Sequence, residues 1–326
     1  MDEILRLFPE KMKQAVQTKI ADKWPLLQEI RVRLYQPIEL IFDKNKIEWI
    51  HFTKPAKNDF IFVLNQLSSF SLYRMEDELR EGYITIEGGH RIGLAGKVNT
   101  LGGSVKAIQH ITFLNIRIAK EKKGIALPIL PYIYHADYLS TLFIGPPQTG
   151  KTTFIRDVTR LIATGWKNIS AKKVGVIDER SEIGASINGV PQHNLGFRTD
   201  VMDACPKAEG MMMMIRSMSP DILVVDEIGS SQDVQALMEA VNAGVTVICT
   251  IHGQSMEELK KRPSLQPIFD QNIFQRFIVL KKHVNPGHIQ QIYNQREVNI
   301  LQKSRCLQGE MDWSTSFHRY NNMDRL

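Results

Sequence analysis

The sequence TLFIGPPQTGKTTFIRDVTRL runs from Thr141 to Leu161 and is the most informative segment of the chain. An apolar run is followed by a turn rich in Gly and Pro, and then by residues with helical spacing. The turn matches G-x-x-x-x-G-K-[ST] at every fixed position. Glycines let backbone N–H groups surround a phosphate, and the positive end of the following helix adds to the attraction. The stretch therefore predicts a strand, a phosphate-binding loop and a helix.

Two residues of this loop have specific expected roles. The lysine, Lys151, neutralises the outer phosphate oxygens of a nucleoside triphosphate, and the hydroxyl of Thr152 holds Mg²⁺. The expected nucleotide-binding residues are Gly145, Pro146, Pro147, Gln148, Thr149, Gly150, Lys151, Thr152 and Thr153.

A second apolar run, in PDILVVDEIG (220–229), delivers two carboxylates to the end of a predicted strand. Ligands of open α/β sheets bind at the carboxyl ends of the strands. We expect Asp226 to hold Mg²⁺ and Glu227 to act as the general base on the attacking water. An adjacent base favours hydrolysis over phosphoryl transfer to another substrate.

Two more strands are predicted to end at the same edge. VGVIDERSEIGAS (174–186) places Glu179 and Glu182 there as catalytic candidates, beside Asp178. VTVICTIHG (245–253) brings Thr250 and His252, and a polar residue at this place often senses the γ-phosphate. Taken alone, His252 would more often be a structural histidine, and the carboxylates would more often belong to a solvated turn. Because all four predicted strands are followed by polar residues at one edge of the sheet, a catalytic site is the better interpretation.

The predicted fold class is α/β: a RecA-like P-loop core with a mainly parallel sheet, preceded by a smaller α+β domain. Buried-type strands separated by helices indicate parallel pairing with right-handed crossovers. We expect an N-terminal domain at 1–120, a linker at 121–135 and the P-loop domain at 136–326. The expected elements of the first domain are a helix at 1–20, a strand at 27–34, a helical segment at 57–81, a hairpin at 82–98 turning at Gly88-Gly89, and a strand at 111–119. A last hairpin is expected at 276–294, turning at 285–287.

Composition limits the remaining possibilities. No apolar run approaches the ~20 residues of a membrane span, so we expect a cytoplasmic protein without a direct membrane span. The formal charge of +6 permits contact with nucleic acid or anionic lipid, but the excess is spread along the chain. The three cysteines lack paired or metal-like spacing, which predicts reduced thiols. The methionines at 211–214 point all around a helix, which indicates packing rather than a channel.

The four motifs, in this order, resemble the superfamily of type II and type IV secretion ATPases. Within it, GPPQTGKTT, VIDERSEI, PDILVVDEIG and NAGVTVICTIHG are similar to the stage III sporulation protein AA family. The resemblance implies ATP as the nucleotide, Glu179 and Glu182 in an acidic box, Asp226 and Glu227 in the Walker B motif, and His252 in a histidine box. This sequence departs from the superfamily pattern in two places. Gly229 stands where an arginine is usual, and the acidic box lacks the usual proline.

The resemblance also implies a hexameric ring, bound peripherally on the mother-cell side to integral membrane proteins of a channel between mother cell and forespore. A nucleic-acid-dependent ring translocase is the main alternative, although the sequence lacks a stacking tract or a recognisable nucleic-acid module, so we expect no nucleic-acid partner. A regulatory switch without turnover is a third reading, which Glu227 disfavours. Ring ATPases usually complete the site with an arginine. We expect Arg198 in this role, with Arg216, Arg31, Arg33 and Arg91 as other candidates.

Overall fold

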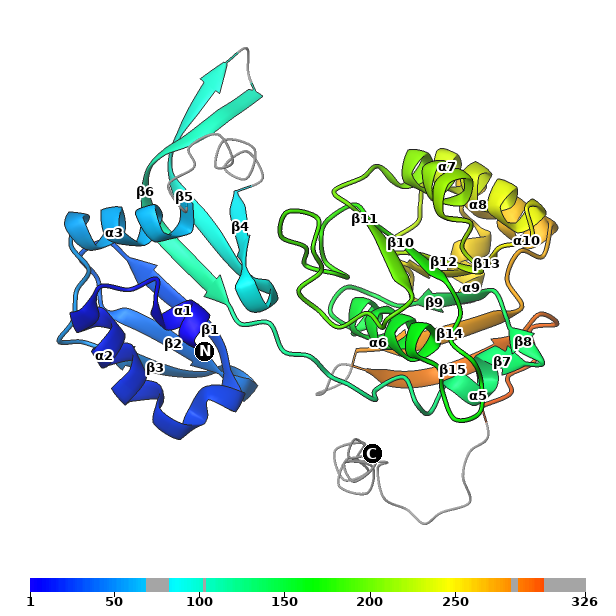
Figure 1. Cartoon of the computed structure of the whole chain (residues 1–326), viewed down its shortest axis with the longest axis horizontal. Coiled ribbons are helices and arrows are strands. Elements are labelled where there is room, and N and C mark those ends of the chain that lie inside the picture. The colour runs from blue at the N-terminus through cyan, green and yellow to red at the C-terminus, as the bar shows by residue number, and fades with distance from the viewer. Residues whose placement is uncertain (69–81, 102–103, 283–286, 302–326) are drawn as a thin grey trace. The chain divides into compact units, whose positions relative to one another are not determined.

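The computed structural model describes residues 1–68, 82–101, 104–282 and 287–301 (Figure 1). The chain forms two compact units. The first contains Met1–Glu121 together with Ala185–His193, and the second contains Lys122–Gly184 and the chain from Asn194 onward. The expected helix at 57–81, the turn at 285–287 and Cys306 fall partly or wholly outside the described residues.

The first unit is built on a six-stranded antiparallel sheet with the order β3-β2-β1-β6-β5-β4. Its strands are β1 (Leu27–Arg33), β2 (Ile38–Phe42), β3 (Lys46–Ile50), β4 (Tyr83–Ile86), β5 (His90–Leu101) and β6 (Ser104–Arg117). Its helices are α1 (Asp2–Leu5), α2 (Glu10–Ile20), α3 (Lys57–Ser68) and the 3₁₀ segments η1 (Ala21–Leu26), η2 (Asp43–Asn45) and η3 (Glu87–Gly89).

One face of this sheet packs against the helices. Ile30 pairs with Leu40 on one side and Ile116 on the other, and all three are buried in a core shared with α1, α2 and α3. The alternation predicted at 27–34 and the hairpin turn at Gly88-Gly89 are confirmed. The prediction of a single helix at 1–20 is wrong, because Pro9, in an extended conformation, separates α1 from α2. Proline lacks the N–H that a continuous helix would need.

The second unit has a seven-stranded sheet with the order β11-β10-β12-β13-β9-β14-β15, in which all pairs except β14–β15 are parallel. Its strands are β9 (Thr141–Ile144), β10 (Val174–Asp178), β11 (Thr199–Asp203), β12 (Ile222–Val225), β13 (Thr246–Ile251), β14 (Arg276–Lys281) and β15 (His288–Asn294). A small separate ribbon pairs β7 (Tyr134–His135) with β8 (Asp137–Tyr138). The helices are α5 (Leu130–Ile133), α6 (Lys151–Thr164), α7 (Lys207–Met218), α8 (Ser231–Asn242), α9 (Met256–Lys260), η4 (Pro263–Leu265) and α10 (Gln266–Asp270).

Helices cover both faces of this sheet, as Figure 1 shows. In β9, Leu142 belongs to the core on the side of α7 and α8, whereas Phe143 belongs to the core on the side of α6. Burial on both faces explains why these strands read as unbroken apolar runs. The four strands predicted from those runs are confirmed, and the predicted α/β core with a mainly parallel sheet is correct.

Two segments differ in detail from their sequence patterns. The stretch expected to be a linker contributes Ala126, Ile129, Leu130 and Ile133 to the core of the second unit, and none of the four is exposed. Strand β11, TDVMD, has no residue that is fully buried and was not predicted. Because β11 is an outermost strand of the sheet, it lacks the apolar run that marks the central strands.

The register of the parallel strands determines which residues lie at the same end of the strands. Ile144 pairs with Ile251, Cys249 with Val225, and Val225 with Ile177. The residues that follow β9, β13, β12 and β10 therefore lie along one edge, which we call the phosphate edge. The opposite edge, where these strands begin, we call the starting edge.

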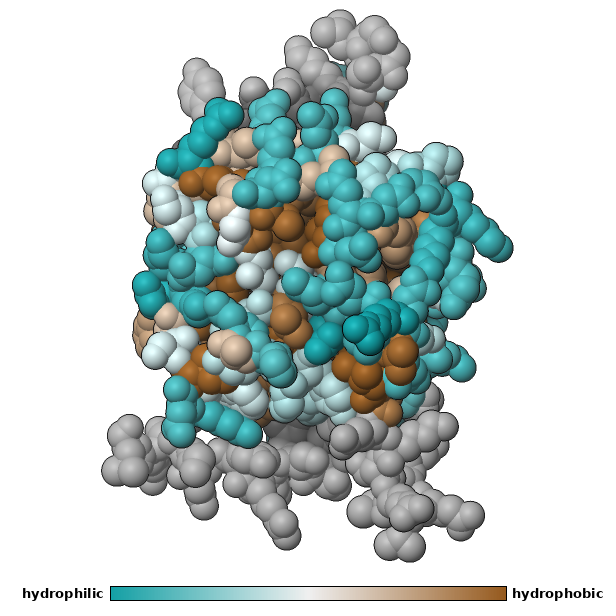
Figure 2. All heavy atoms as spheres, turned by 90° about the vertical axis from the view of Figure 1, so that its right-hand side faces the viewer, coloured by the Kyte–Doolittle hydropathy of each residue, from teal (hydrophilic) through white to brown (hydrophobic). Residues whose placement is uncertain are grey.

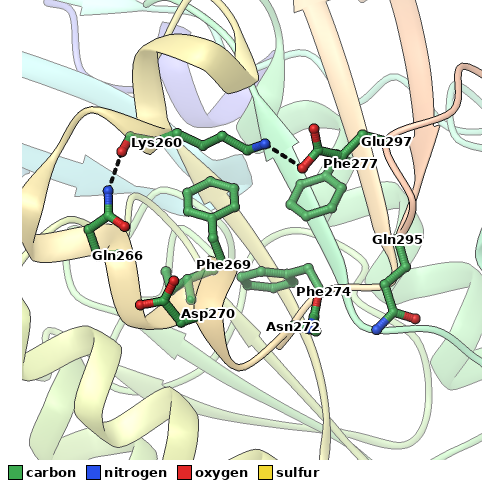
Figure 3. Close-up of a pocket in the computed structure, with 10 residues that line it drawn as sticks. Lys260, Gln266, Phe269, Asp270, Asn272, Phe274, Phe277, Gln295 and Glu297 are labelled. Carbon is green, nitrogen blue, oxygen red and sulfur yellow. Dashed lines mark hydrogen bonds and ion pairs between the residues drawn. The ribbon is translucent and has the colours of Figure 1, made fainter.

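The starting edge contains a cavity of about 420 Å³ beside the first residues of β14 (Figure 3). Phe269, Phe274 and Phe277 line it, with ring centroids of Phe269 and Phe277 6.2 Å apart. Lys260 and Glu297 form an ion pair at its rim. Figure 2, which looks onto the right-hand side of Figure 1, shows hydrophobic patches between hydrophilic side chains on this side of the molecule.

Candidate nucleotide site

The phosphate-binding loop joins β9 to α6 and has a tightly folded backbone. Gly145 packs so closely that a Cβ there would lie 2.6 Å from Thr149 Oγ1, and Gly150 has φ +92°, a conformation that favours glycine. The hydroxyl of Thr149 donates to the Pro146 carbonyl at 2.8 Å. Pro147, Gln148 and Thr153 belong to this loop and to the first turn of α6. The tight loop holds its backbone next to the N-terminus of α6, where free N–H groups and the helix dipole attract anions.

Lys151 is the first residue of α6 and is nearly fully buried. Its Nζ donates to the carbonyls of Gly145 at 2.9 Å and Pro146 at 3.2 Å and lies 3.0 Å from His252 Nδ1. Burial lowers the pKa of the Lys151 ammonium, while Glu227, Asp226 and Glu182 act in the opposite direction. The lysine is thus held at the loop by weak neutral acceptors that an anionic phosphate would replace.

Thr152 and Asp226 face each other across the site. The Thr152 hydroxyl donates to Asp226 Oδ2 at 2.9 Å, and the Thr250 hydroxyl contacts the other oxygen, Oδ1. In the described part of the chain, no three His, Cys, Asp or Glu side chains form a metal site of their own. A hydroxyl and a carboxylate suit Mg²⁺, which keeps several waters and takes its other ligands from phosphates. The pair therefore fits the expected metal.

Glu227 follows Asp226 and is fixed by its backbone as well as its side chain. Its N–H donates to Thr250 Oγ1 at 2.8 Å, and its φ of +53° is rare for a residue with a side chain. Its carboxylate lies 2.6 Å from His252 Nε2 and 2.7 Å from an Arg180 nitrogen. The contacts to Glu227 thus come from β13 and the residue after it (Thr250 and His252) and from the turn after β10 (Arg180). Strained backbone at a polar site is a typical feature of catalytic residues.

The acidic segment after β10 has two roles. Asp178 is buried and accepts the N–H groups of Glu182, Ile183 and Gly184 at 2.8 to 3.0 Å, so it shapes the turn. Burial raises the pKa of Asp178, and these hydrogen bonds oppose the rise. Glu179 and Glu182 line one recess with Asp226 and Glu227, and Asp178 also borders it. Glu179 pairs there with Lys207.

The structure does not bring Arg198 to this site. Arg198 precedes β11 and binds the carbonyl of Ala171 at the starting edge. Arg216 lies in the last turn of α7, before β12 begins. In the first unit, Arg31 and Arg33 pair with Glu29 and Glu39, and Arg91 lies over the ring of Tyr83. A role for Arg198 in a neighbouring subunit stays a prediction.

Arg180 and Lys207 are residues of the recess that the sequence motifs did not single out. Arg180 stands inside the acidic segment, between Glu179 and Glu182, where its charge was a visible signal. Lys207, at the first position of α7, could be found only from the fold, because it is 28 residues from its partner Glu179.

The remaining residues of interest are structural. Met211 and Met214 are buried in the core between α7 and the sheet, as expected of packing residues. Burial raises the pKa of the Cys249 thiol, which is inaccessible inside β13, and that of Cys205 as well. Among the helices that the structure describes, none combines the length and apolar content needed to cross a bilayer.

The fold and the loop define a RecA-like P-loop core, preceded in the sequence by a smaller α+β domain. Two solved structures share this fold at low sequence identity. The ATPase DotB of Legionella pneumophila is 15% identical with a TM-score of 0.56, covering 84% of this chain and 76% of that one. The pilus retraction motor PilT with bound ADP is 16% identical with a TM-score of 0.58, covering 85% and 77%.

The family follows from sequence. The family model described as "Sporulation stage III, protein AA" matches residues 1–300. Stage III sporulation protein AA of Bacillus subtilis (strain 168) is 48% identical over 304 residues, which cover 93% of this chain and 98% of the relative. The chain belongs to this family.

Proposed function

We propose that this chain is a Mg²⁺-dependent ATPase that hydrolyses ATP to ADP and phosphate. The observation that carries the proposal is the hydrogen-bonded set of Lys151, Thr152, Asp226, Glu227 and His252, assembled at the phosphate edge from α6 and the ends of β12 and β13. Binding alone would not need a carboxylate at the position of Glu227. The family, and the fold shared with the ATPase DotB and the retraction motor PilT, support the same reading.

Each side chain has a part in this reaction. Lys151 and the loop hold the phosphates, and Thr152 and Asp226 hold Mg²⁺, which would neutralise charge on the phosphate oxygens. Glu227 accepts the proton of the attacking water. His252, between Lys151 and Glu227, links the state of the loop to the base. Glu179 and Glu182 line the same recess and complete its acidic wall.

The larger assembly belongs to the proposal as well. We infer a hexameric ring in the cytoplasm, peripheral to a membrane through integral membrane partners, which powers assembly of or transport through a mother cell–forespore channel during sporulation. Membership of the sporulation family supports the setting, and the fold shared with an ATPase and a pilus retraction motor supports the role as a motor. The functional domains proposed are 1–120 and 136–326, joined by 121–135.

The test is ATP turnover by the purified chain with and without DNA, together with Glu227→Gln. We expect Mg²⁺-dependent turnover that DNA leaves unchanged and that the substitution lowers by roughly 10²- to 10⁴-fold, the usual contribution of a general base. Full activity of the variant would remove Glu227 from the mechanism. A manyfold stimulation by DNA would favour a nucleic-acid translocase instead. Recovery of integral membrane sporulation proteins with trapped Glu227→Gln protein would test the partners.

A further inference from the structure

Arg180 contacts the side chain proposed as the general base. Its guanidinium NH1 lies 2.7 Å from Glu227 Oε2, while His252 Nε2 lies 2.6 Å from Oε1. The two carboxylate oxygens are therefore held by two different side chains, from segments that follow two different strands. Each oxygen keeps a further lone pair for a water molecule. This arrangement fixes the orientation of the Glu227 carboxylate and still leaves it able to accept a hydrogen bond from a water molecule.

The backbone that carries Arg180 is firmly braced. Asp178 accepts three N–H groups of the turn, and Arg156 donates to the carbonyls of Glu182 and Ile183 at 2.7 and 2.9 Å. The hydroxyl of Ser181 donates to Asp203 Oδ1 at 2.7 Å, which ties the next residue to β11. An anchored turn can hold a guanidinium in one place although its side chain is long.

Stability does not explain the Arg180–Glu227 pair. The Arg180 side chain is 62% exposed, and exposed ion pairs contribute little to folding. The neighbouring charges are already engaged, since Asp178 binds backbone groups and Glu179 pairs with Lys207. Arg180 contacts Glu227 instead.

We propose that Arg180 is a positioning residue for hydrolysis: it orients the Glu227 carboxylate, together with His252, so that the base faces the attacking water. This inference rests on the proposed ATPase function. Arg180 acts through Glu227, so its removal affects the chemical step and leaves the Lys151 loop, which binds the phosphates, intact.

The experiment compares Arg180→Ala and Arg180→Lys with Arg6→Ala. Arg6 is a matched control, because its side chain is 58% exposed against 62% for Arg180 and lies 2.9 Å from Glu87 in the first unit. We expect Arg180→Ala to lower kcat by about 10-fold, a fraction of the roughly 10²- to 10⁴-fold that a general base contributes, and to leave KM for ATP within about 3-fold. Arg180→Lys should recover part of the rate, since an ammonium offers the charge but not the planar fork. Arg6→Ala should match the wild type.

A binding readout avoids turnover altogether. ADP with aluminium fluoride mimics the transferring phosphoryl group together with the ordered water, so its affinity relative to ADP reports the positioned base. We expect Arg180→Ala to reduce this preference by about 10-fold at unchanged ADP affinity. In the Glu227→Gln background the same substitution should have no further effect, because residues that act as a unit are not additive.

The outcomes separate the two proposals. Wild-type turnover without any effect of Arg180→Ala on kcat or on the preference for aluminium fluoride would overturn the role of Arg180 and leave the ATPase standing. Equal losses of ADP affinity and rate, or a full additional loss in Glu227→Gln, would assign Arg180 to nucleotide binding and overturn the positioning role. A wild type that binds ADP but never hydrolyses ATP would remove the proposed function and, with it, the role of Arg180.

Discussion

The two edges of the parallel sheet in the second unit carry different kinds of residue. At the phosphate edge, polar side chains after β9, β10, β12 and β13 contact one another over distances of 2.6 to 3.0 Å. At the starting edge, aromatic rings line a cavity, and the Arg198 guanidinium donates to the backbone carbonyl of Ala171. Both edges contain charged residues, so charge alone does not mark the site. Convergence of side chains from several strands does.

The first prediction tests whether the starting edge serves stability. Phe274 is 1% exposed and its ring packs edge-on against Phe277, with centroids 6.3 Å apart. Phe274→Ala should lower the free energy of unfolding by about 3–5 kcal/mol, because it removes a buried ring and leaves a cavity. Denaturant unfolding measures this loss. The ATP affinity of the folded variant should stay at the wild-type value, and a large change in affinity would contradict the separation of the two edges.

The second prediction concerns binding at the phosphate edge. Lys151→Ala removes the buried ammonium of the loop, so ATP affinity should fall by roughly 10- to 100-fold, the range for one hydrogen bond to a charged group. Titration with a fluorescent ATP analogue gives the affinity. Thermal unfolding without nucleotide serves as the control, since a destabilised loop would lower both quantities together.

The third prediction follows from the pKa of Lys151, which burial lowers below its ordinary value of 10.5. Phosphates favour the protonated lysine, so the pKa is higher in the complex than in the free protein. Binding of ATP should therefore be independent of pH while the free lysine is charged, and should weaken by up to about tenfold per pH unit above the pKa of the free protein. Calorimetry should show proton uptake in that alkaline range. Lys151→Met should lose the uptake; if it persisted, another group would be responsible.

The smallest expected effect belongs to Arg198. Arg198→Ala changes an exposed contact at the starting edge, so the free energy of unfolding should move by less than about 0.5 kcal/mol and the ATP affinity of the isolated chain should not change. Its turnover in the oligomer is the informative measurement. A fall in kcat without a change in affinity would show that Arg198 completes the site of a neighbouring subunit, and unchanged kcat would end its candidacy as an arginine finger.

Much of the fold was predictable from local pattern. Apolar runs buried on both faces gave the four central strands, and the two glycines at 88–89 gave the hairpin of the first unit. Prediction failed where local pattern was weak. The edge strand β11 has only half-buried residues, and β2 and β3 of the first unit were not separated from the residues around them. Pro9 was read as part of a helix although it divides two.

The phosphate-binding loop can be located from the amino-acid sequence, because the constraints on Gly145, Gly150 and Lys151 are local and appear as fixed spacing. The sequence also shows that carboxylates and a histidine follow buried strands. Which of these side chains meet depends on the folded sheet: the register of β10, β12 and β13 brings Arg180, Glu227 and His252 together, and it leaves Arg198 at the starting edge. Strand pairing joins residues that are distant in the chain, and spacing along a sequence carries no information about that pairing.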